Sequence, residues 1–204
     1  MNRKGKKPWE AVMDMLLSYR HLGCRETASG VRLIGHVPRI GPEAHLHTVY
    51  PPLPAMQVEQ MEGTLGVTFP ESIRQFYSHS NGLNCFVDVL SIFGKRKNYV
   101  RTGDAARQPF DLLAMNAPGE RPRARGQTIV VIGGYDWDGS HLYFDGANRP
   151  ERIFRCSRDS VVPLNSWPNF WTMLYQEVKR LSLLFSDKGV KLDPDQPTTP
   201  KDHT

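Results

Sequence analysis

The chain has 204 residues and a formal net charge of +5, and its contents of hydrophobic residues (39%) and charged residues (23%) are ordinary for a globular protein. This length fits one domain with extensions better than two full domains. No run approaches the roughly 18 consecutive apolar residues that a membrane span requires, so the sequence excludes a transmembrane helix.

The N-terminal residues are basic and precede an apolar segment, as in a signal peptide, but Glu10 and Asp14 interrupt that segment. No small-residue cleavage site follows it, and we therefore expect no signal peptide. The three cysteines, Cys24, Cys85 and Cys156, are odd in number and far apart, which argues against a disulfide framework or a zinc site. We expect a cytoplasmic protein, because such unpaired cysteines are typical of a reducing compartment.

The positive excess lies mainly in residues 1–49, where Lys4, Lys6 and Lys7 form a small basic group. Nucleic-acid binding requires a clustered basic face on the folded domain. A solvated basic terminus explains these lysines better, and we expect no direct contact with nucleic acid.

Apolar residues at helical spacing predict a first helix from about residue 8 to residue 22, beginning at Pro8 and ending at Gly23. The stretch 24–54 contains five prolines, and we interpret it as irregular, with one short strand at Val31–Ile34. Residues 1–52 are therefore assigned to an N-terminal extension, a helix followed by a loop that contains prolines and histidines.

A compact domain is predicted for residues 53–185. Its first helix has a buried stripe formed by Val58, Met61 and Leu65. Gly66 ends this helix, because glycine readily adopts the left-handed conformation of a helix C-terminus. Pro70 suits the first turn of a second helix, and Thr68 and Glu71 have the spacing of a capping box.

Asn81 and Gly82 accept positive φ and are predicted to end the second helix. Strands are then predicted at Cys85–Gly94, Thr128–Ile132, His141–Phe144 and Arg152–Cys156. The last two alternate in polarity and are interpreted as half-exposed. Turns at Gly139 and Asn148 favour an antiparallel meander.

A short helix is predicted at Phe110–Met115, and a long amphipathic helix at Trp167–Phe185 closes the domain. The polar, proline-containing residues 186–204 are predicted to form a disordered tail. Helices and strands are grouped rather than alternating. This order predicts an α+β fold, a twisted antiparallel sheet flanked by helices, with an extra N-terminal helix.

The segment LPAMQVEQMEGTLGVTFPESIRQFYSHSNG resembles the opening of the SUKH superfamily, the Smi/Knr-type domain. The matching positions are Leu65-Gly66, Phe69-Pro70 and Asn81-Gly82. Further on, IVVIGGYDWDGSHLYFD resembles the strand–glycine–acidic turn–strand segment of that family, and SWPNFWTMLYQEVKRL resembles its closing helix. The resemblance covers roughly residues 53–185.

The resemblance implies an α+β fold without catalysis or cofactor. Many bacterial members look like immunity proteins, which bind and silence a polymorphic toxin, often a nuclease. We therefore expect a cognate toxin protein as the partner, bound by a monomer or weak homodimer. A related fungal domain acts in cell-wall and signalling regulation, so a non-enzymatic regulatory or scaffold protein is the alternative.

The turn YDWDGS is the best candidate for a partner-binding surface. Tryptophan and tyrosine are enriched in binding hot spots, and carboxylates complement a basic partner such as a nuclease. The candidate residues are Tyr135, Asp136, Trp137, Asp138, His141 and Asp145. A plain Asp-Gly hairpin turn is the competing interpretation. A calcium loop is disfavoured because the EF-hand spacing and its final glutamate are absent.

Other chemistry is less well supported by the sequence. His36, His45 and His47 are close together, but only Glu43 could complete a metal site. His79 lies between two serines, but consecutive helical residues do not face each other and no nucleophile elbow is present.

Two further motifs receive plain interpretations. Gly133-Gly134 lacks the pattern of a phosphate-binding loop. Arg121, Arg123 and Arg125 are interpreted as a solvated basic loop. A hydrolase or metal enzyme is therefore the least favoured function.

Overall fold

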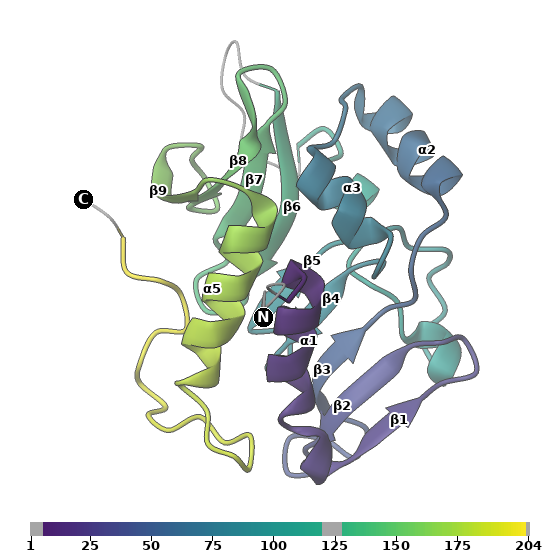
Figure 1. The fold of residues 1–204 in the computed structure, drawn as a ribbon, viewed down its shortest axis with the longest axis vertical. Helices are drawn as coiled ribbons and strands as arrows, with labels where there is room; N and C mark the ends of the chain where they lie inside the picture. The colour runs from purple at the N-terminus through teal and green to yellow at the C-terminus, as the bar shows by residue number, and fades with distance from the viewer. Residues whose placement is uncertain (1–5, 120–127, 203–204) are drawn as a thin grey trace, which may run out of the picture.

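The computed structural model describes residues 6–119 and 128–202, and within them it contains a nine-stranded antiparallel sheet. Each strand pairs with the next one in the chain, from β1 to β9. The strands are β1 (Cys24–Glu26), β2 (Arg32–His36), β3 (His45–Val49), β4 (Leu83–Cys85), β5 (Leu90–Ile92), β6 (Ile129–Tyr135), β7 (His141–Asp145), β8 (Arg149–Cys156) and β9 (Pro163–Trp167). Figure 1 shows the sheet twisting, with β1 to β3 oblique to β6 to β8.

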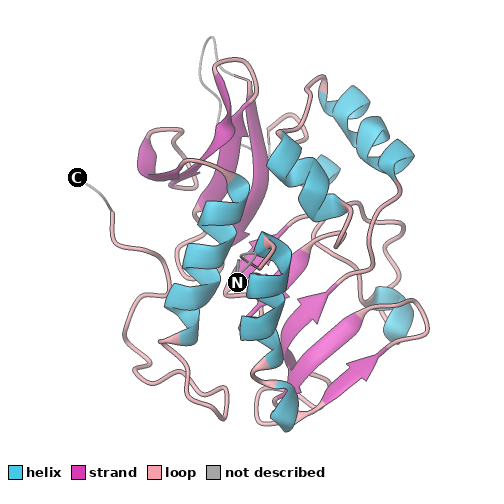
Figure 2. Cartoon of the chain, in the orientation of Figure 1, coloured by secondary structure: helices cyan, strands magenta, loops and turns pink. Residues whose placement is uncertain are grey.

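Five α-helices complete the described fold: α1 (Pro8–Leu17), α2 (Ala55–Leu65), α3 (Glu71–Tyr77), α4 (Leu112–Met115) and α5 (Phe170–Ser182). Short 3₁₀ turns lie at Arg20–Leu22 and Asp104–Ala106. Helix α5 packs on α1, α3, β8 and β9, so these helices cover one side of the sheet (Figure 2). The expected α+β architecture is confirmed.

Residues 24–54 are more regular than the sequence indicated. The strand expected at Val31–Ile34 is present as β2, but β1 and β3 flank it, and β3 pairs with β4 of the predicted domain. Helix α1 buries Val12 and Leu16 completely, and it packs against α5. Short strands between prolines carry little local periodicity, and they are stabilised by pairing with distant strands. The extension therefore shares one sheet and one core with residues 53–185.

The α2–α3 region has the expected helices but a different cap. Helix α2 ends at Gly66, which has φ +69°. The predicted capping box at Thr68 does not form, because Pro70 is the N-cap residue of α3. The carboxylate of Glu62 instead accepts a hydrogen bond from the backbone amide of Phe69 at 2.5 Å. It also forms an ion pair with Arg74 at 2.6 Å.

Asn81 and Gly82 lie beyond the helix that they were predicted to end, because α3 stops at Tyr77. The Asn81 side chain exchanges two hydrogen bonds with the backbone of Lys95, at 2.8 Å and 2.6 Å. Gly82 has φ +100°, and a Cβ atom there would lie 2.8 Å from the carbonyl oxygen of Ile92. This pair therefore fixes a close approach of two backbone segments.

The strand predicted at Cys85–Gly94 is interrupted. Phe86, Val87 and Asp88 have φ of 54°, 58° and 67°, a left-handed turn between β4 and β5. Such values are rare for residues with side chains and most of all for a β-branched residue. We call residues 86–89 the left-handed turn. Tertiary packing compensates its strain, because the Phe86 ring is 1% exposed and stacks on Phe185 at 4.5 Å.

The meander is confirmed, with β6, β7 and β8 paired in sequence. Strand β9 lacks a strong sequence pattern and was missed. Strand β7 is buried along its whole length rather than half-exposed.

The C-terminal tail, predicted to be disordered, has a defined structure over residues 186–202. Residues 186–202 follow a defined path against the domain, and Thr198 is only 2% exposed. Side chains of the domain bind carbonyl groups of this segment, so a polar composition did not prevent ordering. Residues 203 and 204 lie outside the described residues, as do Arg121, Arg123 and Arg125 of the predicted basic loop.

Candidate functional site

The predicted turn connects β6 to β7. Gly139 has φ +68°, and the Asp138 carboxylate accepts a hydrogen bond from the Ser140 amide at 2.9 Å. Asp138 also forms an ion pair with Arg155 at 2.6 Å. Burial opposes its ionisation, but the hydrogen bonds from Ser140 and Arg155 outweigh burial and lower the pKa of Asp138. The hairpin interpretation thus accounts for Asp138.

The six candidate binding residues divide by exposure. Trp137 is 46% exposed and Asp136 is exposed, whereas Tyr135, His141 and Asp145 are buried at 3%, 9% and 5%. The Lys191 ammonium lies 4.1 Å from the centre of the Trp137 ring, a cation–π contact. Only the tip of the turn is therefore accessible to a large partner.

The buried candidates have intramolecular roles. The Tyr135 hydroxyl donates a hydrogen bond to Glu177 at 2.7 Å. Asp145 accepts hydrogen bonds from the amides of Thr128 and Ala147, both at 3.1 Å, and from the Asn148 side chain. Burial works against the charge of Asp145, but these hydrogen bonds prevail and lower its pKa.

A cleft of about 320 Å³ lies beside the turn. Its lining includes Tyr135, Asp136 and His141 from the candidate set, together with Asp88, Ser91 and Phe110. The strand register explains the polar floor, because Ser91 pairs with Gly134, and Gly134 pairs with His141. A second hollow of about 320 Å³, lined by Asn84 among others, shares Asp88 and Phe110 with the cleft.

Asp88 is the acceptor that sequence reasoning missed. Asp88 lies in the left-handed turn, and its carboxylate accepts a hydrogen bond from the side-chain amide of Asn84 at 2.5 Å. The surrounding protein excludes water from the Asp88 carboxylate and so raises its pKa, and the negative charge of Asp136 acts in the same direction. The side-chain oxygen of Asn84, Oδ1, is buried and accepts no hydrogen bond within the described structure. The only sequence signal was polar Asn84, Asp88 and Ser91 in an otherwise apolar segment.

The lining of the cleft carries two carboxylates and one guanidinium, that of Arg158. Asp88 and Asp136 are carboxylates, and Asp136 makes no ion pair with a described residue. Burial lowers the pKa of His141, and the charge of Arg158 lowers it further, which disfavours the charged ring. Phe110 is 43% exposed and supplies an apolar wall. The carboxylates of Asp88 and Asp136 suit a donor-rich cationic group such as a lysine or arginine side chain of a partner, and Arg158 limits the net negative charge of the cleft.

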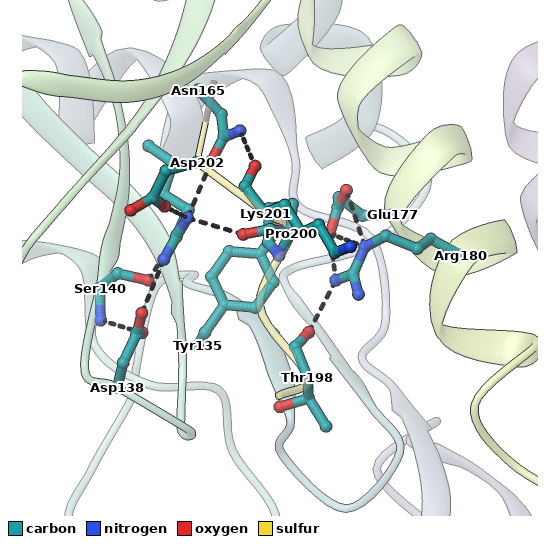
Figure 3. Close-up of polar contacts among 11 residues, drawn as sticks. Tyr135, Asp138, Ser140, Asn165, Glu177, Arg180, Thr198, Pro200, Lys201 and Asp202 are labelled. Carbon is teal, nitrogen blue, oxygen red and sulfur yellow. Dashed lines mark hydrogen bonds and ion pairs between the residues drawn. The ribbon is translucent and has the colours of Figure 1, made fainter. Parts of the chain in front are cut away.

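A second polar network lies behind the turn (Figure 3). The guanidinium of Arg155 is 3% exposed and donates to Ser140, Asn165 and the carbonyl oxygen of Pro200 at 2.9, 2.8 and 3.0 Å. It also pairs with Asp202 at 2.8 Å. A buried guanidinium requires such partners, so Arg155 joins the turn to the C-terminal segment.

The fold brings His36 and His45 together and keeps His47 apart from them in the core. His47 is buried against Tyr19 and Phe86, and burial lowers its pKa to about 3. The rings of His36 and His45 lie 5.1 Å apart, but each binds a backbone carbonyl group. Within residues 6–119 and 128–202, no group of three or more His, Cys, Asp or Glu side chains is placed to hold a metal ion.

The serines next to His79 are also engaged elsewhere. The Ser80 hydroxyl is buried and donates to backbone carbonyl groups, whereas the His79 ring stacks on Trp9 at 5.6 Å. No nucleophile–base contact joins them in the described structure. Gly133-Gly134 has a packing role, because a Cβ atom on Gly133 would lie 2.4 Å from the Ser91 carbonyl oxygen.

Comparison with known families gives one result. Residues 52–176 match the sequence model described as the SMI1 / KNR4 family (SUKH-1). No curated protein and no solved structure matches the chain significantly. Among the described helices, none is long and apolar enough to cross a membrane.

Proposed function

Because the chain belongs to the SMI1 / KNR4 family (SUKH-1), we propose that it is a non-enzymatic immunity protein that binds and neutralises a cognate toxin by direct contact. The observation that carries the proposal beyond the family is the exposed pair Asp136 and Trp137 in the β6–β7 turn, of which Asp136 also lines the cleft. Aromatic residues at the centre of an interface dominate its binding energy.

The proposed binding surface consists of Asp136, Trp137, Asp88 and Phe110. Trp137 and Phe110 are its exposed apolar side chains, and Asp88 and Asp136 line the cleft together with Phe110. Asp138 is excluded from this surface, because it neutralises Arg155. Tyr135 and His141 line the cleft, whereas Asp145 lies at the other end of β7 and is not part of this surface.

The electrostatics favour a basic partner surface. A nuclease must present Lys and Arg side chains to phosphate groups, and the acceptors of the cleft can occupy such side chains. The net charge of +5 disfavours mimicry of nucleic acid by the whole chain. A local acidic cleft would act at short range and block the toxin sterically.

The test is protection of a bacterial host that expresses the toxin encoded next to this gene. The wild-type chain is expected to restore growth and to co-purify with the toxin. Trp137→Ala and Asp136→Lys should each lose protection while the variant protein stays folded. The charge reversal targets Asp136 because Asp138→Lys would also break the pair with Arg155.

Matched controls are available on other surfaces. Tyr175 is an exposed aromatic residue on α5, and Glu59 is an exposed carboxylate on α2. Tyr175→Ala and Glu59→Lys should leave protection intact. The proposal fails if the wild-type chain protects against no adjacent toxin, and the surface is wrong if the control variants lose protection instead.

A further inference from the structure

The C-terminal segment lies in a seat that binds it through its backbone. We call residues 197–202 the strap, and we call Arg155, Asn165 and Arg180 the seat. Arg180 donates to the carbonyl oxygen of Thr198 at 2.7 Å, and Asn165 donates to that of Lys201 at 2.7 Å (Figure 3). Arg155 donates to the carbonyl oxygen of Pro200 and to the Asp202 carboxylate.

These contacts have the chemistry of peptide recognition. Four acceptors of the strap, three carbonyl groups and one carboxylate, meet donors on the seat. Among the described residues, no backbone–backbone hydrogen bond joins the strap to a strand. Pro197 and Pro200 favour an extended backbone, which presents its carbonyl groups outward. The seat therefore binds the carbonyl groups of an extended backbone and one acidic side chain.

The seat is itself held in position. Glu177 is 4% exposed, pairs with Arg180 at 2.6 Å and accepts the hydrogen bond of Tyr135. Arg155 is fixed by Asp138 and lies 5.9 Å from the centre of the Tyr135 ring. A preorganised set of donors lowers the cost of binding a peptide.

The strap is an imperfect occupant. The hydroxyl group of Thr198 is buried and has no hydrogen-bond partner within the described structure. An unsatisfied buried hydroxyl weakens binding. Residues 192–197, which precede Thr198, are exposed. An exposed segment therefore links the strap to the domain, and departure of the strap would open the donors of the seat to water.

We propose that the seat is a peptide-binding site that the strap occupies in cis, and that an extended partner segment with a carboxylate two residues after a proline displaces it. The tether gives the strap an effective concentration of about millimolar, so a free peptide competes poorly until the strap is loosened. This inference stands on the contacts of the seat and does not rest on toxin neutralisation.

The test uses the full chain and a fluorescent peptide with the sequence of residues 194–202, PDQPTTPKD. Fluorescence anisotropy measures its binding to the wild type and to Asp202→Lys, which sets an ammonium group beside Arg155 and loosens the strap. We expect the variant to bind the peptide at least about tenfold more tightly than the wild type does. Hydrogen exchange should also become faster at residues 198–202 of the variant.

Asp195→Lys is the matched control, because it makes the same charge change on the same segment at a residue that forms no ion pair with a described residue. It should bind the peptide as weakly as the wild type does. A peptide with Asn at its last position should bind Asp202→Lys about fivefold less tightly, since it lacks the carboxylate for Arg155.

Two results would overturn the inference. One is equal peptide affinity for Asp202→Lys and Asp195→Lys, and the other is equal affinity of the two peptides for Asp202→Lys. If Asp202→Lys does not fold, the seat variant Asn165→Ala in the full chain replaces it. That variant should also speed exchange at residues 198–202, and unchanged exchange there would overturn the inference.

Discussion

The guanidinium of Arg155 lies 2.6 Å from the carboxylate of Asp138, and the Arg155 side chain is 3% exposed whereas that of Asp138 is 34% exposed. This pair connects β8 to the tip of the β6–β7 hairpin. The two carboxylates that flank Trp137, Asp136 and Asp138, therefore have different roles. Asp138 holds the turn in place, and Asp136 faces solvent.

Asp138→Ala is expected to lower the free energy of unfolding by about 1–3 kcal/mol. The loss is smaller than for a fully buried pair, because Asp138 is partly exposed and Arg155 keeps Asp202 and Asn165 as partners. Urea denaturation at pH 7 measures it. Asp136→Ala is the control and should change the value by less than about 0.5 kcal/mol. Equal effects of the two variants would refute the assignment.

Trp137→Ala is expected to weaken toxin binding by about 2 kcal/mol or more, roughly thirtyfold in Kd, because the ring is the largest exposed group of the proposed surface. Titration calorimetry with the purified toxin measures the change. Tyr175→Ala removes an aromatic side chain of similar exposure from α5 and should leave Kd unchanged. A Kd for Trp137→Ala within twofold of the wild-type value would exclude Trp137 as an anchor.

His47 is expected to make stability depend on pH. Its pKa is about 3 in the folded protein and 6.5 as an ordinary histidine, because burial disfavours the charged ring. Between these values the unfolded chain binds a proton that the folded protein does not. Stability is therefore fully present above pH 6.5 and falls as the pH drops towards 3, by up to about 1.4 kcal/mol per pH unit.

Urea denaturation of the wild type and of His47→Gln at pH 7 and pH 5 measures this contribution. The wild type should lose more stability between the two pH values than the variant loses. His79→Gln, at an exposed histidine, serves as the comparison. Parallel losses in the wild type and His47→Gln would show that His47 does not contribute.

Thr198→Val is expected to raise the free energy of unfolding by about 1 kcal/mol, because it replaces an unsatisfied buried hydroxyl with a methyl group of similar size. Thermal denaturation measures the gain. Thr199→Val, at the neighbouring half-buried residue, is the control. A lower melting temperature for Thr198→Val would mean that the hydroxyl has a partner such as water.

Deletion of residues 1–50 is expected to abolish cooperative folding. Sequence analysis placed the domain boundary near residue 53, and toxin binding would then survive the deletion. The structure instead has β3 pairing with β4 and Leu16 fully buried. Leu16→Ala is the milder test, and it should cost about 2–5 kcal/mol in urea denaturation. A folded, toxin-binding fragment 51–204 would restore the original boundary.

The candidate site was only partly visible in the sequence. Trp137 and Asp136 were predicted because tryptophan is enriched in binding hot spots and carboxylates complement a basic partner, and the structure leaves both side chains exposed. The burial of Tyr135, His141 and Asp145 was missed, because alternation suggested one solvated face. Segments far along the chain meet these side chains, as shown by the hydrogen bond from Tyr135 to Glu177 of α5.

The sequence by itself determined the elements whose signals are local. Periodicity marked α5, Gly66 marked the end of α2, and β-rich runs between turns marked the β6–β8 meander. Neighbouring residues carry these signals, because helical stripes and tight turns are set within a few positions.

Only the tertiary structure decided the rest. It placed β1 to β3 in the sheet, formed the left-handed turn that carries Asp88, and ordered the strap. Arg155 illustrates the reason, since its partners Asp138 and Asp202 lie 17 and 47 positions away in the chain. The pairing of a buried charge depends on which distant segments meet it, and no local pattern records that meeting.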